Sequence, residues 1–176
     1  PLTRGGTSLD ASISIDAKGK VSGLLVRPAP PAPAPPPSAT ATFTEKELMV
    51  GAGEGALPAT LTMPKGQGPF PAAVLVHGSG PQDRDETIGA NRHFLDIARG
   101  LAAQGVAVLR YEKRTKARPQ DYAAGVNIDN ETTDDAVTAL ATLRAQSGVD
   151  SKRIFVIGHS QGGMMAPRIA MKDGKI

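Results

Sequence analysis

The short motif Gly-x-Ser-x-Gly at residues 158–162 constrains the fold of this chain more than any other stretch of its sequence. The residues before it, 154–157, are apolar and rich in β-branched side chains, which predicts a short buried strand. The residues after it, 164–171, predict a helix. A strand, a tight turn and a helix in this order are the context of a nucleophile elbow, so we predict that Ser160 at the tip of the turn is a nucleophile.

The two glycines of the motif have a steric role in this prediction. The residues two before and two after the serine approach each other closely, and a Cβ at Gly158 or Gly162 would clash there. The turn would raise the Ser160 Oγ above the sheet, at a helix N-terminus that stabilises a developing negative charge. A glycine-rich turn with an ordinary surface serine is the alternative explanation.

Three apolar runs separated by amphipathic segments predict an α/β fold. The runs at residues 72–76, 106–109 and 154–157 are typical of strands buried on both faces. Residues 91–104 and 131–146 have helical spacing of their apolar side chains. The resulting alternation of strand and helix predicts a mostly parallel sheet with helices on both faces.

The first quarter of the chain differs from the rest in composition. Residues 1–27 contain two strand-like runs around a turn, and we expect the tail of a preceding small domain or a β-hairpin extension. Residues 28–39 are proline-rich and predict an extended, solvent-exposed linker. Residues 40–176 carry the α/β pattern, which begins with two antiparallel strands expected near 41–50 and 57–63.

Composition excludes several classes of function. The net charge of +3 is small and the basic residues are scattered, which argues against nucleic-acid binding. The absence of cysteine excludes disulfides, zinc–thiolate sites and cysteine nucleophiles. No apolar run approaches the length of a membrane span. Because the chain begins with Pro1 and shows no signal-peptide pattern, we expect a processed chain or a fragment.

The loop after the apolar run 72–76 contains a second pattern, His-Gly-Ser-Gly-Pro at residues 77–81. Small residues leave backbone N–H groups accessible, and an acyl-transfer enzyme needs two such donors aimed at a developing oxyanion. We predict that one donor is the amide of Gln161, directly after the nucleophile. The loop would supply the other from Ser79, with Gly80 as second choice. A glycine turn without a ligand role is the alternative.

Two charged segments complete the list of candidate sites. Residues 83–86, Asp-Arg-Asp-Glu, could hold a divalent ion, but ion pairs within the loop are favoured. The sequence therefore predicts no metal and no cofactor. Residues 111–114 follow a predicted strand and could border a pocket, although a solvated loop with one structural arginine is favoured.

The strands and the residues that follow them resemble the α/β-hydrolase superfamily. The resemblance rests on residues 74–81, 108–114 and 158–163 and extends over about residues 40–172. It is most similar to bacterial serine esterases of the dienelactone-hydrolase-like branch, in which Gly-Ser-Gly-Pro-Gln-Asp-Arg-Asp-Glu follows the first His-Gly. The resemblance implies a three-layer α/β-hydrolase fold with a mostly parallel sheet, of which residues 40–176 form the N-terminal part.

The resemblance also implies an activity, the hydrolysis of a small-molecule carboxylic ester through an acyl-enzyme on Ser160. It implies no cofactor. Such enzymes often carry a small N-terminal domain and are often exported, so we expect a periplasmic or extracellular location rather than a cytoplasmic one. The sequence does not indicate the oligomeric state.

The catalytic triad of this superfamily runs in the order serine, acid, histidine, and no histidine follows Ser160. His77 and His159 belong to the loop and elbow motifs. We expect His93 to be a surface or packing histidine. We therefore expect the triad acid and base to lie outside this chain, which by itself should be inactive. A serine peptidase or acyltransferase on the same fold is an alternative, as is a non-catalytic envelope or interaction protein built around the proline-rich spacer.

Overall fold

The computed structural model describes residues 2–4, 7–29 and 34–176, and the chain divides into two compact units. The first unit comprises residues 1–35 with 89–91, and the second comprises 36–88 with 92–176. The first contains an antiparallel sheet in the order β1-β2-β3, built from β1 (Leu2–Arg4), β2 (Thr7–Ile15) and β3 (Val21–Pro28).

The turn between β2 and β3 follows from local hydrogen bonding. The carboxylate of Asp16 accepts bonds from the backbone amides of Lys18 and Lys20, at 2.8 and 2.9 Å. Beyond β3, residues 34–38 have no helix or strand, and residues 30–33 of the proline-rich stretch lie outside the described residues.

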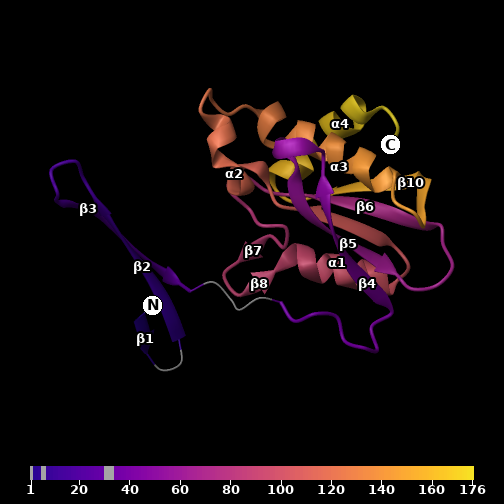
Figure 1. The fold of residues 1–176 in the computed structure, drawn as a ribbon, viewed down its shortest axis with the longest axis horizontal. Coiled ribbons are helices and arrows are strands. Elements are labelled where there is room, and N and C mark those ends of the chain that lie inside the picture. The colour runs from indigo at the N-terminus through magenta and orange to yellow at the C-terminus, as the bar shows by residue number, and fades with distance from the viewer. Residues whose placement is uncertain (1, 5–6, 30–33) are drawn as a thin grey trace. The chain divides into compact units, whose positions relative to one another are not determined.

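The second unit is organised on a five-stranded sheet in the order β10-β6-β9-β5-β4 (Figure 1). Strands β10, β6 and β9 run parallel to one another, whereas β5 is antiparallel to both β9 and β4. The bounds are β4 (Phe43–Val50), β5 (Leu57–Pro64), β6 (Phe70–Val76), β9 (Ala107–Tyr111) and β10 (Val149–Gly158). The antiparallel pair and the three apolar strands are therefore confirmed, and the α/β-hydrolase fold class with them.

Three helices cover the two faces of this sheet. Helix α1 (His93–Ala103) lies on one face, and α3 (Asp134–Arg144) and α4 (Gln161–Asp173) lie on the other (Figure 1). Each face has its own apolar core. On the α1 side the core contains Leu75, Phe94, Ala98 and Val108, and on the other side Val74, Val76, Leu109, Leu140, Leu143 and Ile169 contribute to it.

The connection between β9 and α3 is more structured than its polar sequence predicts. It contains two short helices, and the last turn before α3 is a π-helix, so the predicted helix over residues 131–146 is an α-helix only from Asp134. The remaining short elements are η1 (Gly53–Gly55), β7 (Thr87–Ile88), β8 (Asn91–Arg92), α2 (Arg114–Ala117), η2 (Pro119–Tyr122) and η3 (Asp129–Thr133).

Strand β10 is the last strand at one edge of the sheet. A hollow of about 540 Å³ lies between this strand and α4, and Phe155 beside it is 54% exposed. The residues that line it carry no polar side chain: Ile154, Phe155, Val156, Gly163, Ala166, Pro167, Ala170 and Ile176. Among the described residues, no helix combines the length and apolar character needed to cross a bilayer.

Candidate active site

Ser160 lies at the sharp turn that joins β10 to α4. It is exposed, and its backbone has φ 50° and ψ −116°, a conformation that is costly for any residue with a Cβ. Ser160 and Glu86 are the non-glycine residues with positive φ in the described part of the chain. The turn is held by the amide of His159, which donates to Val76 O at 3.0 Å, and by that of Gly162, which donates to His159 O at 2.8 Å.

The close approaches at this turn require glycine at two positions. A Cβ on Gly158 would lie 2.3 Å from the carbonyl carbon of Gly162. A Cβ on Gly162 would lie 2.1 Å from the carbonyl oxygen of Val76, at the end of the neighbouring strand β6. Real Cβ contacts do not occur at such distances, so the chain can turn here only without these side chains.

The loop after β6 lies directly against the serine. A Cβ placed on Gly78 would be 3.4 Å from the Ser160 Cβ and 3.2 Å from the His159 Nδ1. The parallel register of β6 and β10, in which Val76 pairs with Gly158, brings the two loops together at the carboxyl ends of the strands. The turn at Ser160 and Gln161 and the loop at Ser79 are about 80 residues apart in the sequence. They meet at the carboxyl ends of the two neighbouring strands.

The backbone amides around Ser160 are not equally available. The Gly78 amide donates to Glu86 Oε1 at 2.8 Å, and the Gly80 amide interacts with the Glu131 carboxylate and contributes to lowering its pKa. The amides of Ser79 and Gln161, by contrast, have no acceptor among the described residues. The contacts therefore favour Ser79 over Gly80 as the loop residue whose N–H is free for a ligand.

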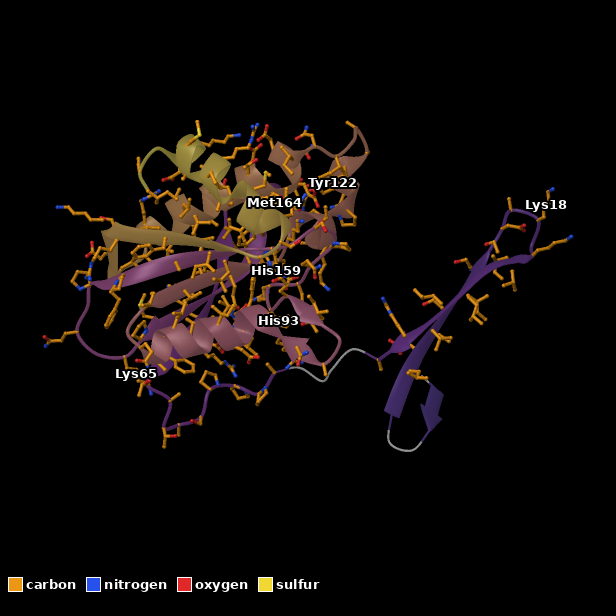
Figure 2. All side chains as sticks on the ribbon, turned by 180° about the vertical axis from the view of Figure 1, so that it is seen from behind. Lys18, Lys65, His93, Tyr122, His159 and Met164 are labelled. Carbon is orange, nitrogen blue, oxygen red and sulfur yellow. The ribbon has the colours of Figure 1, made fainter. Side chains whose placement is uncertain are left out.

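Glu86 joins the two loops, a role that sequence analysis did not predict when it considered residues 83–86. Its side chain is buried, and Oε1 contacts both the Gly78 amide and the His159 Nδ1, the latter at 3.0 Å. The other oxygen, Oε2, is buried without a hydrogen-bond partner in the described part of the chain. His159 itself is half exposed beside the turn (Figure 2). Glu86 is the last residue of the Asp-Arg-Asp-Glu segment and the buried one among these four. Its place in this segment is the only feature of the sequence that could have pointed to it.

Lys113 is buried at the site, contrary to the prediction of a solvated loop over residues 111–114. Its side chain is 3% exposed, and Nζ donates to Gly78 O, Glu131 Oε1 and Gln161 Oε1 at 2.7, 2.9 and 3.1 Å. Burial acts to raise the pKa of Glu131, but hydrogen bonds from Lys113 and Gln161 outweigh it, so the pKa lies below its usual value. The carboxylate is therefore charged and paired with the ammonium group.

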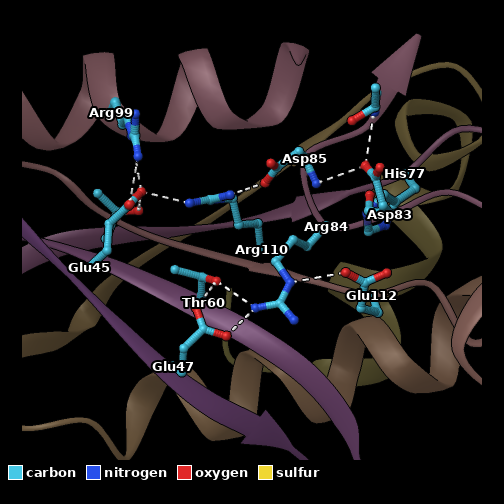
Figure 3. A network of polar contacts seen from close by, with 12 residues as sticks. Glu45, Glu47, Thr60, His77, Asp83, Arg84, Asp85, Arg99, Arg110 and Glu112 are labelled. Carbon is cyan, nitrogen blue, oxygen red and sulfur yellow. Dashed lines mark hydrogen bonds and ion pairs between the residues drawn. The ribbon is translucent and has the colours of Figure 1, made fainter. Parts of the chain in front are cut away.

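Arg84 and Asp85 of the Asp-Arg-Asp-Glu segment form ion pairs outside the loop (Figure 3), whereas the Asp83 carboxylate accepts from the backbone amides of Asp85 and Thr87. Arg84 pairs with Glu47 of β4 and with Glu112, while Asp85 pairs with Arg110 of β9. The prediction of ion pairs within the loop was wrong in this respect, because the partners lie on β4, on β9 and directly after β9, which only the fold brings near. The described residues hold no group of three histidine, aspartate or glutamate side chains that could bind a metal ion.

Residues 73–176 match the alpha/beta hydrolase family. This chain belongs to that family. The match starts within β6 and includes the loop at Ser79, the turn at Ser160 and helix α4.

This α/β-hydrolase chain is similar in sequence to one named esterase and shares its fold with others. Esterase EstD of Thermotoga maritima is 43% identical over 165 residues, which make up 94% of this chain and 39% of EstD. A hyperthermophilic esterase from the archaeon Pyrobaculum calidifontis has a TM-score of 0.54 and 22% identity, covering 75% of this chain and 41% of its own. The carboxylesterase EstE1 from a metagenomic library has a TM-score of 0.54 and 24% identity, covering 80% and 44%. The chain thus spans less than half of each of these proteins, and the solved structures show a shared fold.

None of the three histidines of this α/β-hydrolase chain is placed as a free base. His77 is buried, and its Nε2 donates to Asp83 O at 3.0 Å. His159 directs Nδ1 to Glu86, and His93 is exposed at the start of α1 (Figure 2). Burial is the main cause that lowers the pKa of His77 to about 3, and the charge of Lys113 acts in the same direction.

We expect His77 to make the stability of the protein depend on pH. The unfolded imidazole binds a proton below about pH 6.5, whereas the folded one stays neutral down to about pH 3. The free energy of unfolding should therefore fall as the pH falls between these values, with a contribution from this group of about 1.4 kcal/mol per pH unit.

Urea unfolding at several pH values between 3 and 8 measures this contribution. A His77→Gln variant, whose side-chain amide can still donate to Asp83 O, should show a shallower decline than the parent protein below pH 6.5. His93→Gln is the matched control at an exposed position and should leave the slope unchanged. Equal slopes in the parent and His77→Gln would contradict the assignment.

Proposed function

We propose that the protein to which this chain belongs is a serine hydrolase that cleaves carboxylic esters through an acyl-enzyme. The proposal rests on one observation, the exposed Ser160 held in a strained turn beside two backbone amides, of Ser79 and Gln161, that lack acceptors in the described residues. The identity to Esterase EstD and the fold shared with other esterases support the choice of substrate class.

In this mechanism the Ser160 Oγ attacks the carbonyl carbon of the ester, and its proton passes to a general base. The carbonyl oxygen becomes an oxyanion that accepts hydrogen bonds from the Ser79 and Gln161 amides. Collapse of the tetrahedral intermediate releases the alcohol, which takes the proton from the base, and leaves the acyl group on Ser160. Water then hydrolyses the acyl-enzyme by the same steps, with the acid product leaving and Ser160 regenerated.

The general base in this proposal is a histidine outside these 176 residues, oriented by an acid that also lies outside them. His77 and His159 do not serve, because the first is buried and the second is engaged by Glu86. His93 is exposed at the start of α1 and makes no hydrogen bond to the residues of the site in the described part of the chain. The chain would then contribute the nucleophile and the oxyanion donors, which its own local geometry forms.

An assay of p-nitrophenyl esters of short acids tests this division of roles. The whole protein should hydrolyse them at ordinary enzymatic rates. The 176-residue chain alone should retain only the weak catalysis of an oxyanion site without a base, several orders of magnitude lower. No hydrolysis of any short-chain ester by the whole protein would contradict the proposed function, and full activity of the isolated chain would contradict the external base.

A further inference from the structure

We propose that Lys113 is a positioning residue of the oxyanion site, which orients and polarises the peptide group that carries the Ser79 N–H. The inference rests on the proposed function, since it concerns how one of the two amide donors acquires its direction and strength. Lys113 contacts neither Ser160 nor the ester in this proposal, and it acts through the backbone.

The geometry that carries the proposal is a single hydrogen bond. Lys113 Nζ donates to Gly78 O at 2.7 Å, and this oxygen belongs to the same peptide group as the Ser79 N–H. The peptide is trans, because the cis bond in the described residues is Gly68–Pro69. In a trans peptide the C=O and N–H point in opposite directions. By binding the oxygen, Lys113 therefore fixes the N–H of Ser79 to point away from the ammonium group.

The charge of Lys113 has an electrostatic effect on the same peptide. A hydrogen bond from an ammonium group withdraws electron density from the carbonyl oxygen and makes the N–H of that peptide a stronger donor. The side chain is 3% exposed, so little water screens this interaction. An oxyanion forming beside Ser79 N–H would gain more from the polarised peptide than the neutral ground-state carbonyl would.

Further contacts hold the ammonium group in place and link it to the second donor residue. Its three N–H bonds all have acceptors, namely Gly78 O, Glu131 Oε1 and Gln161 Oε1. Gln161 is the residue whose backbone amide would be the other oxyanion donor. Gln161 Nε2 also donates to Glu131 Oε2 at 3.0 Å, which completes a triangle of side chains. One buried ion pair thus ties the loop after β6 to the start of α4.

The same ion pair explains which amides remain free. The Gly80 amide interacts with Glu131 and the Gly78 oxygen accepts from Lys113, whereas the Ser79 N–H between them has no acceptor in the described part of the chain. A purely structural lysine would stabilise the loop without affecting the transition state more than the ground state. This difference can be measured.

The experiment uses the whole protein and the variants Lys113→Gln, Lys113→Gln with Glu131→Gln, and Lys116→Gln. The double variant removes the buried carboxylate that Lys113→Gln would leave unpaired, and so protects the fold. Lys116→Gln removes an exposed positive charge three residues away and is the matched control. The readouts are urea unfolding, kcat and KM on p-nitrophenyl butyrate, and the inhibition constant of a trifluoromethyl ketone, whose hemiketal oxyanion occupies the site.

We expect kcat of the Lys113 variants to fall about 10- to 100-fold, whereas KM should change less than about threefold. The inhibition constant of the ketone should rise by about the same factor as kcat falls. Lys116→Gln should match the parent protein. A folded Lys113 variant with parental kcat and ketone affinity would overturn the proposal. So would a loss of kcat with unchanged ketone affinity, because it would place the effect outside the oxyanion. Retained hydrolysis by Ser160→Ala in parallel would refute the proposed function itself, whatever the Lys113 variants do.

Discussion

Replacement of Ser160 by alanine in the whole protein should lower kcat for p-nitrophenyl butyrate by about 10⁴- to 10⁶-fold. The variant loses the atom that forms the acyl-enzyme in the proposed mechanism, while the proposed oxyanion donors remain. KM should change little, and mass spectrometry of the parent, but not of the variant, should detect a fluorophosphonate adduct on the peptide that contains Ser160.

The structure allows a clean control for this substitution. The Ser160 side chain has no hydrogen-bond partner among the described residues, so alanine should leave the stability near that of the parent. Ser151 is exposed near the start of the same strand β10, at the opposite end from the turn. Ser151→Ala also removes a hydroxyl and should keep full activity. Undiminished hydrolysis by Ser160→Ala would exclude this serine as the nucleophile.

Replacement of Gly162 by alanine should destabilise the protein by about 4 kcal/mol or more, or prevent it from folding. The new methyl group would meet the Val76 carbonyl oxygen at 2.1 Å, and a backbone atom in a buried strand cannot move aside as a side chain can. Soluble yield and urea unfolding measure the effect.

Gly100→Ala is the matched substitution, with the opposite expected sign. Gly100 lies in helix α1, where an added Cβ meets nothing within 4 Å. Alanine there should raise the free energy of unfolding by about 0.5–1 kcal/mol, because it favours the helix over the unfolded chain. If the two variants had the same stability, the close packing of the turn against β6 would be wrong.

The features that sequence analysis predicted are those that neighbouring residues determine. Short apolar runs rich in β-branched residues and bounded by turn residues favour buried strands, and β6, β9 and β10 were found where expected. The turn at Ser160 is also local, because Gly158 and Gly162 are needed for steric reasons that the spacing of the motif already contains.

The features that it missed depend on partners distant in sequence. Lys113 follows a strand in a run of charged residues, which is typical of a solvated loop, yet its three acceptors lie 18 to 48 residues away. Glu86 likewise contacts His159 across 73 residues. A charged residue is buried only when the fold supplies such partners, and a pattern of neighbouring residues carries no information about them.

The exposed edge of β10 has a practical consequence for work with the isolated chain. Ten residues of this strand present one row of backbone groups without a neighbouring strand in the described sheet, next to the exposed Phe155 and the apolar hollow under α4. Such an edge can pair with the same strand of another copy of the chain, and this pairing promotes aggregation. The turn at Ser160 follows the end of this strand, so self-association along this edge would involve residues next to the proposed nucleophile. Protein concentration is therefore a variable that every measurement on the 176-residue chain must control.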